Sequence, residues 1–123
     1  MAKVLVIDDS MFMRMQLVEI LKSGGHQVAQ VGDSREGLTL ARNLRTKLDC
    51  ILLDLLMPHL DGLEFLAALR QEGLTTPVIV HTADIQEKTR QRCLELGAKD
   101  FLNKPPRREA LLAAVQAVTR PGR

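Results

Sequence analysis

The feature that most constrains the fold is a regular alternation of short apolar runs with helical patterns. Five runs rich in apolar and β-branched residues are expected to be strands: residues 3–8, 27–31, 50–56, 77–82 and 99–103. Apolar residues at helical spacing follow each run, in segments 13–21, 34–47, 62–71, 85–96 and 111–118. Strands that alternate with helices predict right-handed βαβ units and a parallel sheet. We therefore expect an α/β fold, a (βα)5 sandwich with helices on both faces.

The length and composition indicate one ordinary globular domain. The chain has 123 residues, of which 46% are hydrophobic and 26% charged. No apolar run approaches the roughly 18 residues that a membrane span needs. The first residues, MAKVLVIDD, lack the layout of a signal peptide. We expect a domain over residues 1–120 with a short tail at 121–123, a cytoplasmic location and no membrane contact.

Charge is distributed unevenly along the chain. Residues 1–84 carry 8 Lys or Arg against 11 Asp or Glu, whereas residues 85–123 carry 9 against 4. Two interpretations remain open: a mixed, solvated surface with a basic tail, or an acidic site together with a basic face for an acidic partner. The chain has no Tyr or Trp to stack on bases, and its basic residues are scattered. No direct contact with nucleic acid is therefore expected.

Acidic and polar residues gather where the predicted strands end. Asp8 and Asp9 follow the first strand, and Asp54 lies towards the end of the third. Thr82 and Lys104 follow the fourth and fifth. Functional groups of open α/β sheets collect at the carboxyl ends of the strands. Three carboxylates there would repel one another unless a hard cation such as Mg²⁺ lay among them, and the Lys104 ammonium adds a second compensating charge.

Four linked motifs resemble those of a known family. VLVIDDS, ILLDLLMPHLDG, VIVHTAD and GAKDFLNKP occur in the order and at the spacing found in receiver domains of two-component response regulators. The resemblance covers nearly the whole chain and implies a flavodoxin-like sheet of strand order 2-1-3-4-5. It also implies a signalling module that takes a phosphoryl group from a histidine kinase or phosphotransfer domain. Such a module is no enzyme beyond its own phosphorylation and dephosphorylation, and we expect a monomer before phosphorylation.

The resemblance assigns a role to each residue of the predicted acidic site. Asp54 would be the phosphoacceptor, a carboxylate nucleophile. Asp9 and Asp54 would bind Mg²⁺ directly, and Asp8 would bind it mainly through water. Leu56 would offer the metal its backbone carbonyl, so that its side-chain type is free.

Three further residues would carry the response to phosphorylation. Lys104 would pair with Asp54 and later with a phosphoryl oxygen. The Lys104–Pro105 peptide bond resembles the family's cis peptide. Thr82 would move its hydroxyl onto the phosphate, and Phe101 would turn inward with it. These movements would reshape the face built from residues 85–119, which would then bind a downstream target protein.

The context of the domain is less constrained. The segment DDSMFMRMQLVEIL resembles the first helix of chemotaxis-type single-domain receivers. Ala110 and Ala114 stand where receivers that drive DNA-binding domains often have a Glu and an Arg for pairing, which disfavours that dimer. A receiver excised from a longer response regulator or hybrid kinase remains an alternative. A haloacid-dehalogenase-like phosphatase is disfavoured, because it needs an acid where Leu56 stands.

Several other side chains invite a functional interpretation. Leu56 and Asp84 occupy positions that tune the lifetime of the phosphate in the family, and their expected effects on that lifetime are opposite. Asp84 could orient the attacking water, whereas Leu56 could crowd it. Three methionines of the first helix are interpreted as core residues: Met11, Met13 and Met15. No chemical role is assigned to the scattered histidines His26, His59 and His81.

Overall fold

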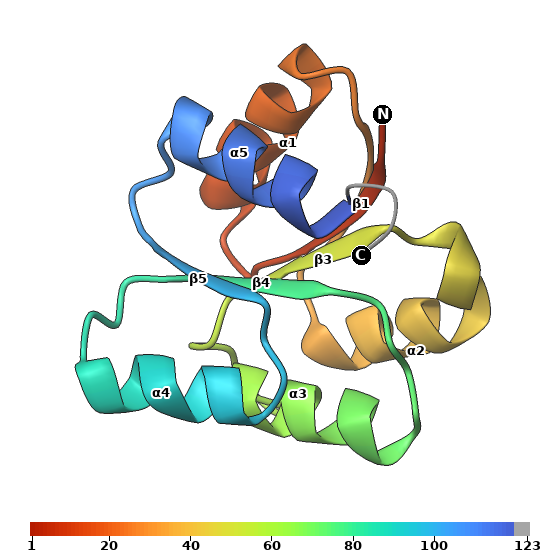
Figure 1. Ribbon diagram of the computed structural model, residues 1–123, viewed down its shortest axis with the longest axis vertical. Helices are drawn as coiled ribbons and strands as arrows, with labels where there is room; N and C mark the ends of the chain where they lie inside the picture. Colours follow the sequence, from red (N-terminus) through yellow and green to blue (C-terminus); the bar gives the residue numbers. More distant parts are fainter. Residues whose placement is uncertain (120–123) are drawn as a thin grey trace.

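A computed structural model of the chain describes residues 1–119 as five strands that alternate with five α-helices (Figure 1). The strands are β1 (Lys3–Ile7), β2 (Gln27–Val31), β3 (Cys50–Leu53), β4 (Val78–Thr82) and β5 (Asp100–Asn103). The helices are α1 (Met11–Ser23), α2 (Ser34–Leu44), α3 (Gly62–Gln71), α4 (Glu87–Glu95) and α5 (Arg108–Thr119), with a short 3₁₀ turn η1 (Arg45–Lys47) after α2. The predicted domain end at residue 120 and the tail at 121–123 lie outside the described residues.

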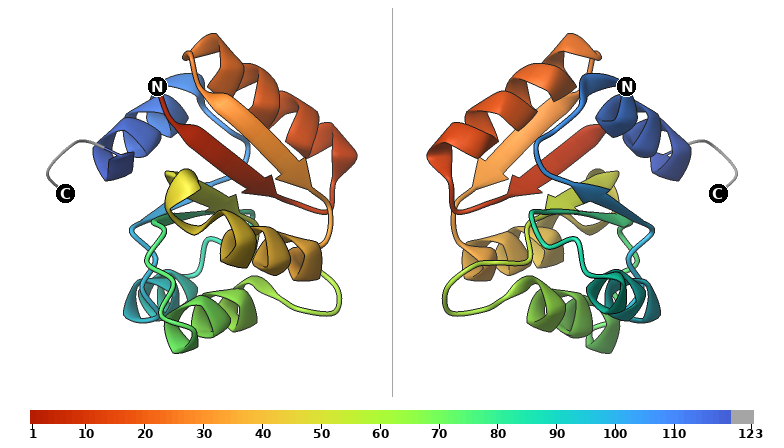
Figure 2. Two further views of the ribbon diagram at one scale, coloured as in Figure 1. Left: turned by 90° about the vertical axis from the view of Figure 1, so that its right-hand side faces the viewer. Right: turned by 90° about the vertical axis from the view of Figure 1, so that its left-hand side faces the viewer.

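The strands form one parallel sheet in the order β2-β1-β3-β4-β5. This confirms the predicted α/β class and the flavodoxin-like strand order. Figure 2 shows α1 and α5 on one face of the sheet and α2, α3 and α4 on the other. Within residues 1–119, no helix is long and apolar enough to cross a membrane.

The central strands are buried on both faces, which explains why they appear as unbroken apolar runs. In β1, Leu5 and Ile7 pack into the core beneath α2, α3 and α4, while Val4 and Val6 pack into the core beneath α1 and α5. All four are fully buried. Successive side chains of a strand alternate between faces, so a strand covered on both sides needs an apolar residue at every position.

Short polar side chains fix where the helices begin. Ser10 caps α1 by accepting a hydrogen bond from the Met13 N–H, and Asp33 caps α2 in the same way from the Arg35 N–H. Asp61 and Glu64 form a reciprocal capping box at the start of α3. These caps place the helix starts just beyond the carboxyl ends of the strands, where the predicted site lies.

Three boundaries differ from the sequence prediction. The third strand ends at Leu53 instead of residue 56, because the chain turns away from the sheet at Asp54, whose Oδ1 accepts a hydrogen bond from the Leu56 N–H at 3.4 Å. The second α-helix ends at Leu44 and tightens into η1. The fourth begins only at Glu87, so Ile85 is 79% exposed and does not belong to the buried stripe.

Candidate functional site: an acidic cluster at the carboxyl edge of the sheet

Three carboxylates meet at the carboxyl edge of the sheet, as the sequence predicted. Asp8 and Asp9 follow β1, and Asp54 follows β3. These two strands are neighbours, with Ile7 paired to Leu53. One carboxylate oxygen from each acid lies within 4.8 Å of the other two. Asp8 and Asp54 are buried, whereas Asp9 is exposed to solvent.

Lys104 reaches this cluster from the loop after β5. Its Nζ lies 2.9 Å from Asp8 Oδ2 and 3.3 Å from Asp54 Oδ2. The sequence analysis paired Lys104 with Asp54 alone, whereas the structure shows one ammonium shared by two buried acids. The Lys104 N–H donates to the Thr82 carbonyl at 2.9 Å, which ties the loop to the end of β4. The peptide between Lys104 and Pro105 is cis, as expected.

Asp54 is buried although it lies at the carboxyl edge of the sheet. Its side chain is only 5% exposed, and that of Asp8 is 2% exposed. The reason is the Lys104 side chain, which lies against both carboxylates and is itself only 17% exposed. A carboxylate at a strand end is therefore covered here by the partner that neutralises it.

The electrostatics of the cluster leave Asp54 short of positive charge. Burial raises the pKa of Asp54, the Lys104 ammonium opposes that shift, and the neighbouring Asp8 adds to it. Burial disfavours the charged form of Lys104 too, but contacts with Asp8 and Asp54 outweigh it, and the pKa of Lys104 is raised. Lys104 therefore stays charged, and one ammonium faces three acids.

The donor atoms of the cluster fit a magnesium ion. All are carboxylate oxygens, which Mg²⁺ prefers, and the exposed Asp9 leaves an open side for water ligands. Asp8 Oδ2 is buried and, among residues 1–119, its contact with Lys104 is an ion pair without hydrogen-bond geometry. That oxygen still has lone pairs to offer. Leu56 is 63% exposed and its side chain has no oxygen, so a contribution to the metal would come from its backbone carbonyl.

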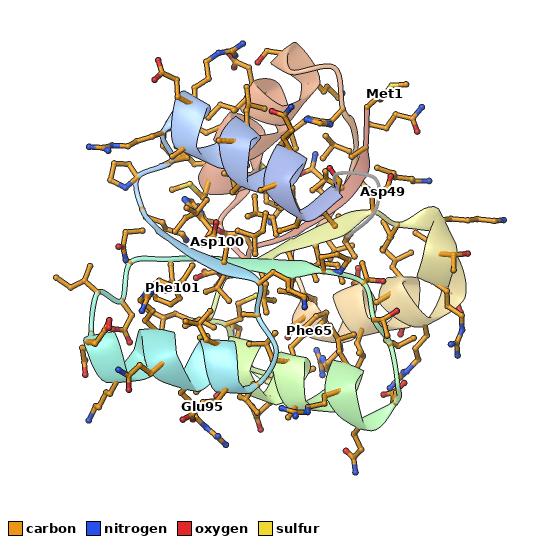
Figure 3. The ribbon with its side chains drawn as sticks, viewed as in Figure 1. Met1, Asp49, Phe65, Glu95, Asp100 and Phe101 are labelled. Atoms are coloured by element: carbon orange, nitrogen blue, oxygen red, sulfur yellow. The ribbon has the colours of Figure 1, made fainter. Side chains whose placement is uncertain are left out.

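Thr82 and Phe101 lie on the neighbouring strands. Thr82 is fully buried at the end of β4, and its Oγ1 accepts a hydrogen bond from the Asp84 N–H at 3.2 Å. Phe101 in β5 pairs in register with Val80 and is half-buried against the core on the α4 side of the sheet (Figure 3). Their coupled movement stays a prediction.

Asp84 is engaged with the start of α4. Its two carboxylate oxygens accept hydrogen bonds from the Gln86 N–H at 2.9 Å and from the Thr89 hydroxyl at 3.0 Å. The Asn103 side chain of β5 donates to its carbonyl at 3.4 Å. This geometry favours a structural role at the β4–α4 loop over the suggested orientation of an attacking water.

Arg14, which the sequence analysis missed, contacts the backbone of the acidic cluster. The Arg14 Nη1 donates to the Asp8 carbonyl at 2.7 Å, and its Nε donates to Gln30 Oε1 at 3.0 Å. A Cβ on Gly32 would lie 2.7 Å from the same Nη1, so the glycine leaves room for the guanidinium. The available signal was an arginine one turn into the helix that follows the acids, together with a glycine just after the second strand.

The expectation that the three methionines of the first helix fill the core is only partly right. Met13 packs against the core, but Met11 and Met15 are 67% and 62% exposed and fill no core position. His81 is 2% exposed and lies beneath the β5–α5 loop, where Lys104 is close enough to influence its pKa. The sequence analysis gave it no role, because nothing in the residues around it marks it out.

The chain matches known proteins over nearly its whole length. The model of the response regulator receiver domain family matches residues 4–116. Protein PilH of Pseudomonas aeruginosa is 36% identical over 120 residues, which cover 96% of this chain and 98% of PilH. Response regulator MprA of Mycolicibacterium vanbaalenii is 39% identical over 118 residues, which cover 96% of this chain but 50% of MprA. The chain thus spans half the length of that relative.

Solved structures show the same fold over nearly the whole chain. Chemotaxis protein CheY4 of Vibrio cholerae superposes with a TM-score of 0.86 at 35% identity, covering 96% of this chain and 98% of CheY4. A structure of the CheX–CheY–BeF₃–Mg²⁺ complex of Borrelia burgdorferi matches with a TM-score of 0.90 at 32% identity, covering 95% of this chain and 88% of the other. These neighbours and PilH support the chemotaxis-type resemblance.

Proposed function

The chain belongs to the receiver domains of response regulators, and from this premise we propose that it is a phosphoacceptor switch that takes a phosphoryl group onto Asp54. Receiver domains are signalling modules that bind Mg²⁺ at an acidic pocket and interact with histidine kinases or phosphotransfer proteins and with targets. The observation that carries the proposal is the cluster of Asp8, Asp9 and Asp54 around the Lys104 ammonium.

The proposed transfer uses these groups directly. A carboxylate oxygen of Asp54 attacks phosphorus while the bond from phosphorus to the donor imidazole nitrogen breaks, and the imidazole leaves with the electron pair. Lys104 stays close to the reacting oxygens and stabilises the charge on them. Asp9 and Asp54 would hold Mg²⁺ directly, Asp8 through water, and Leu56 through its carbonyl. When bound, the metal supplies further positive charge to the phosphoryl oxygens.

The response would start from the hydroxyl of Thr82. That hydroxyl accepts a hydrogen bond from the Asp84 N–H before phosphorylation. A phosphoryl group on Asp54 adds acceptor oxygens and negative charge, which draw the hydroxyl away and give Phe101 room to turn inward. The face of residues 85–119 would then change shape and bind a target protein.

Two contexts remain for this switch. PilH and CheY4 are covered almost completely by the match, which supports a stand-alone receiver. We further propose that it is cytoplasmic, is a monomer before phosphorylation and contacts no nucleic acid. The half coverage of MprA supports the second candidate, a receiver within a longer regulator. In both, catalysis is limited to the domain's own phosphorylation and dephosphorylation.

Acetyl phosphate provides the test. The wild-type chain with Mg²⁺ should take up one phosphoryl group, Asp54→Asn should take up none, and the exposed control Glu19→Gln should behave as wild type. Beryllofluoride with Mg²⁺ should shift NMR signals across residues 82–104 in the wild type only. Uptake at another residue of Asp54→Asn would contradict the assignment of the phosphoacceptor, and unchanged signals over 82–104 would contradict the switch.

A further inference from the structure

A second recess lies beside the acidic cluster, between the end of the sheet and the start of α5. It is lined by His81 of β4, by strand β5, by the loop from Lys104 to Arg107 and by Ala110 and Leu111 of α5. Figure 1 shows this loop rising along one edge of the sheet to α5. Its volume of about 480 Å³ lies within the range of small-molecule sites.

His81 is an unusual group to find in the lining of this recess. The side chain is 2% exposed, and neither ring nitrogen has a hydrogen-bond partner among residues 1–119. Burial lowers the pKa of His81 to about 4, helped by the charge of Lys104, so the ring is neutral near pH 7. A neutral imidazole carries one N–H donor and one acceptor nitrogen, and leaving both unused in the interior is costly. The ring therefore has the capacity to bind a polar group in the recess.

The charge of the recess favours an anion. Arg107 lines it, and no acidic side chain does; Lys104 lines it too, but its ammonium already contacts the carboxylates of Asp8 and Asp54. The positive end of the α5 dipole lies at the same place, since the helix begins at Arg108. Ala110 adds only a small side chain to the lining, and Pro106 and Leu111 supply apolar surface.

We propose that this recess binds a small organic anion, with one carboxylate or phosphate head group directed at the His81 ring N–H and Arg107 and an apolar body against Pro106 and Leu111. The site adjoins the phosphorylation site through Lys104 but uses different side chains. It would give the domain a second, small-molecule input next to the proposed phosphoacceptor. The proposal does not depend on the phosphorylation of Asp54.

Matched probes test the site by NMR titration of the full chain. Naphthalene carboxylate and naphthyl phosphate share an apolar body and differ in the head group, and naphthamide is the neutral isostere. We expect one or both anions to shift signals of residues 101–111 and of the His81 ring, and the amide to bind at least tenfold more weakly. Which anion binds more tightly identifies the head group.

Variants separate this site from a general attraction of anions to a basic surface. Ala110→Trp should abolish binding by filling the recess, while uptake from acetyl phosphate persists because Ala110 takes no part in the acidic cluster. Arg107→Gln should weaken binding several-fold, whereas Arg90→Gln on α4 should leave it unchanged. His81→Leu should remove the response to the anions while circular dichroism reports an intact fold.

Three results would overturn the proposal. One is equal weakening by Arg90→Gln and Arg107→Gln, which would indicate non-specific attraction. Another is equal binding of the neutral amide. The third is no binding of either anion up to its solubility limit, together with ordered water on both nitrogens of His81 in a crystal structure. None of these would affect the test of Asp54, so failure here and failure of the proposed function remain distinguishable.

Discussion

Replacing Asp54 with Asn should stabilise the protein in the absence of divalent cations. At an effective dielectric constant of about 20, two like unit charges within 4.8 Å of each other repel by at least about 3.5 kcal/mol, and opposite charges 3.3 Å apart, the distance from Lys104 to Asp54, attract by about 5 kcal/mol. Asp8 and the better-solvated Asp9 both repel Asp54. The attraction to Lys104 is therefore largely cancelled, and the cost of burying the Asp54 carboxylate remains.

The sign of the Asp54 pKa shift leads to the same expectation. A carboxyl whose pKa is raised by folding destabilises the folded state once the pH exceeds its unfolded pKa, so the penalty is present near pH 7. Asparagine has nearly the same shape and no charge. We expect Asp54→Asn to raise the free energy of unfolding by about 1–3 kcal/mol in EDTA, since a buried ion carries a desolvation cost of several kcal/mol.

Urea unfolding followed by circular dichroism measures the effect, because the chain has no Trp or Tyr to report by fluorescence. Mg²⁺ should stabilise the wild type more than Asp54→Asn, so the difference should shrink or reverse as the cation is added. The exposed control Glu19→Gln should stay within about 0.5 kcal/mol of the wild type. A less stable Asp54→Asn in EDTA, or equal stabilisation of both proteins by Mg²⁺, would refute the electrostatic argument.

Three further predictions concern groups around the cluster. The pKa of His81 is about 4 in the folded chain and 6.5 as its reference value, so the unfolded chain takes up a proton first as the pH falls. The free energy of unfolding of the wild type should therefore fall by about 3 kcal/mol between pH 6.5 and pH 4. Urea unfolding at a series of pH values should show no such fall for His81→Leu. Arg14→Met removes the hydrogen bond to the Asp8 carbonyl and should weaken Mg²⁺ binding about tenfold by calorimetry; unchanged affinity would rule out a supporting role. Asp84→Ala removes both carboxylate contacts at the start of α4 and should speed amide hydrogen exchange over residues 86–90, with a stability cost of about 1 kcal/mol.

The fold could be predicted from the sequence because each buried parallel strand needs an apolar residue at every position. That requirement produces the runs around Val4, Ile51 and Ile79, which periodicity detects. Boundaries were less predictable, since they depend on single hydrogen bonds. Asp54 ends the third strand by accepting from the Leu56 N–H, and Asp84 delays the start of α4 by engaging Gln86.

The composition of the acidic site was predictable for a similar reason. Parallel strands all deliver their carboxyl ends to one edge, so acids after β1 and β3 must meet there once the sheet order is known. The partner of each acid was not predictable in this way. Lys104 comes from a loop, and its reach to Asp8 as well as Asp54 depends on the path of that loop beyond β5.

The burial of Asp54 follows from this sharing of Lys104. A single ammonium that contacts two carboxylates covers both of them, so neither is solvated, yet it neutralises only one unit of charge. The cluster is thereby left with excess negative charge in a poorly solvated place, which a divalent cation would balance. Arg14 holds the Asp8 carbonyl, and Gly32 leaves room for the Arg14 guanidinium, so the backbone of Asp8 is held in position. A site arranged in this way gives up some stability in its empty state and gains affinity for a cation.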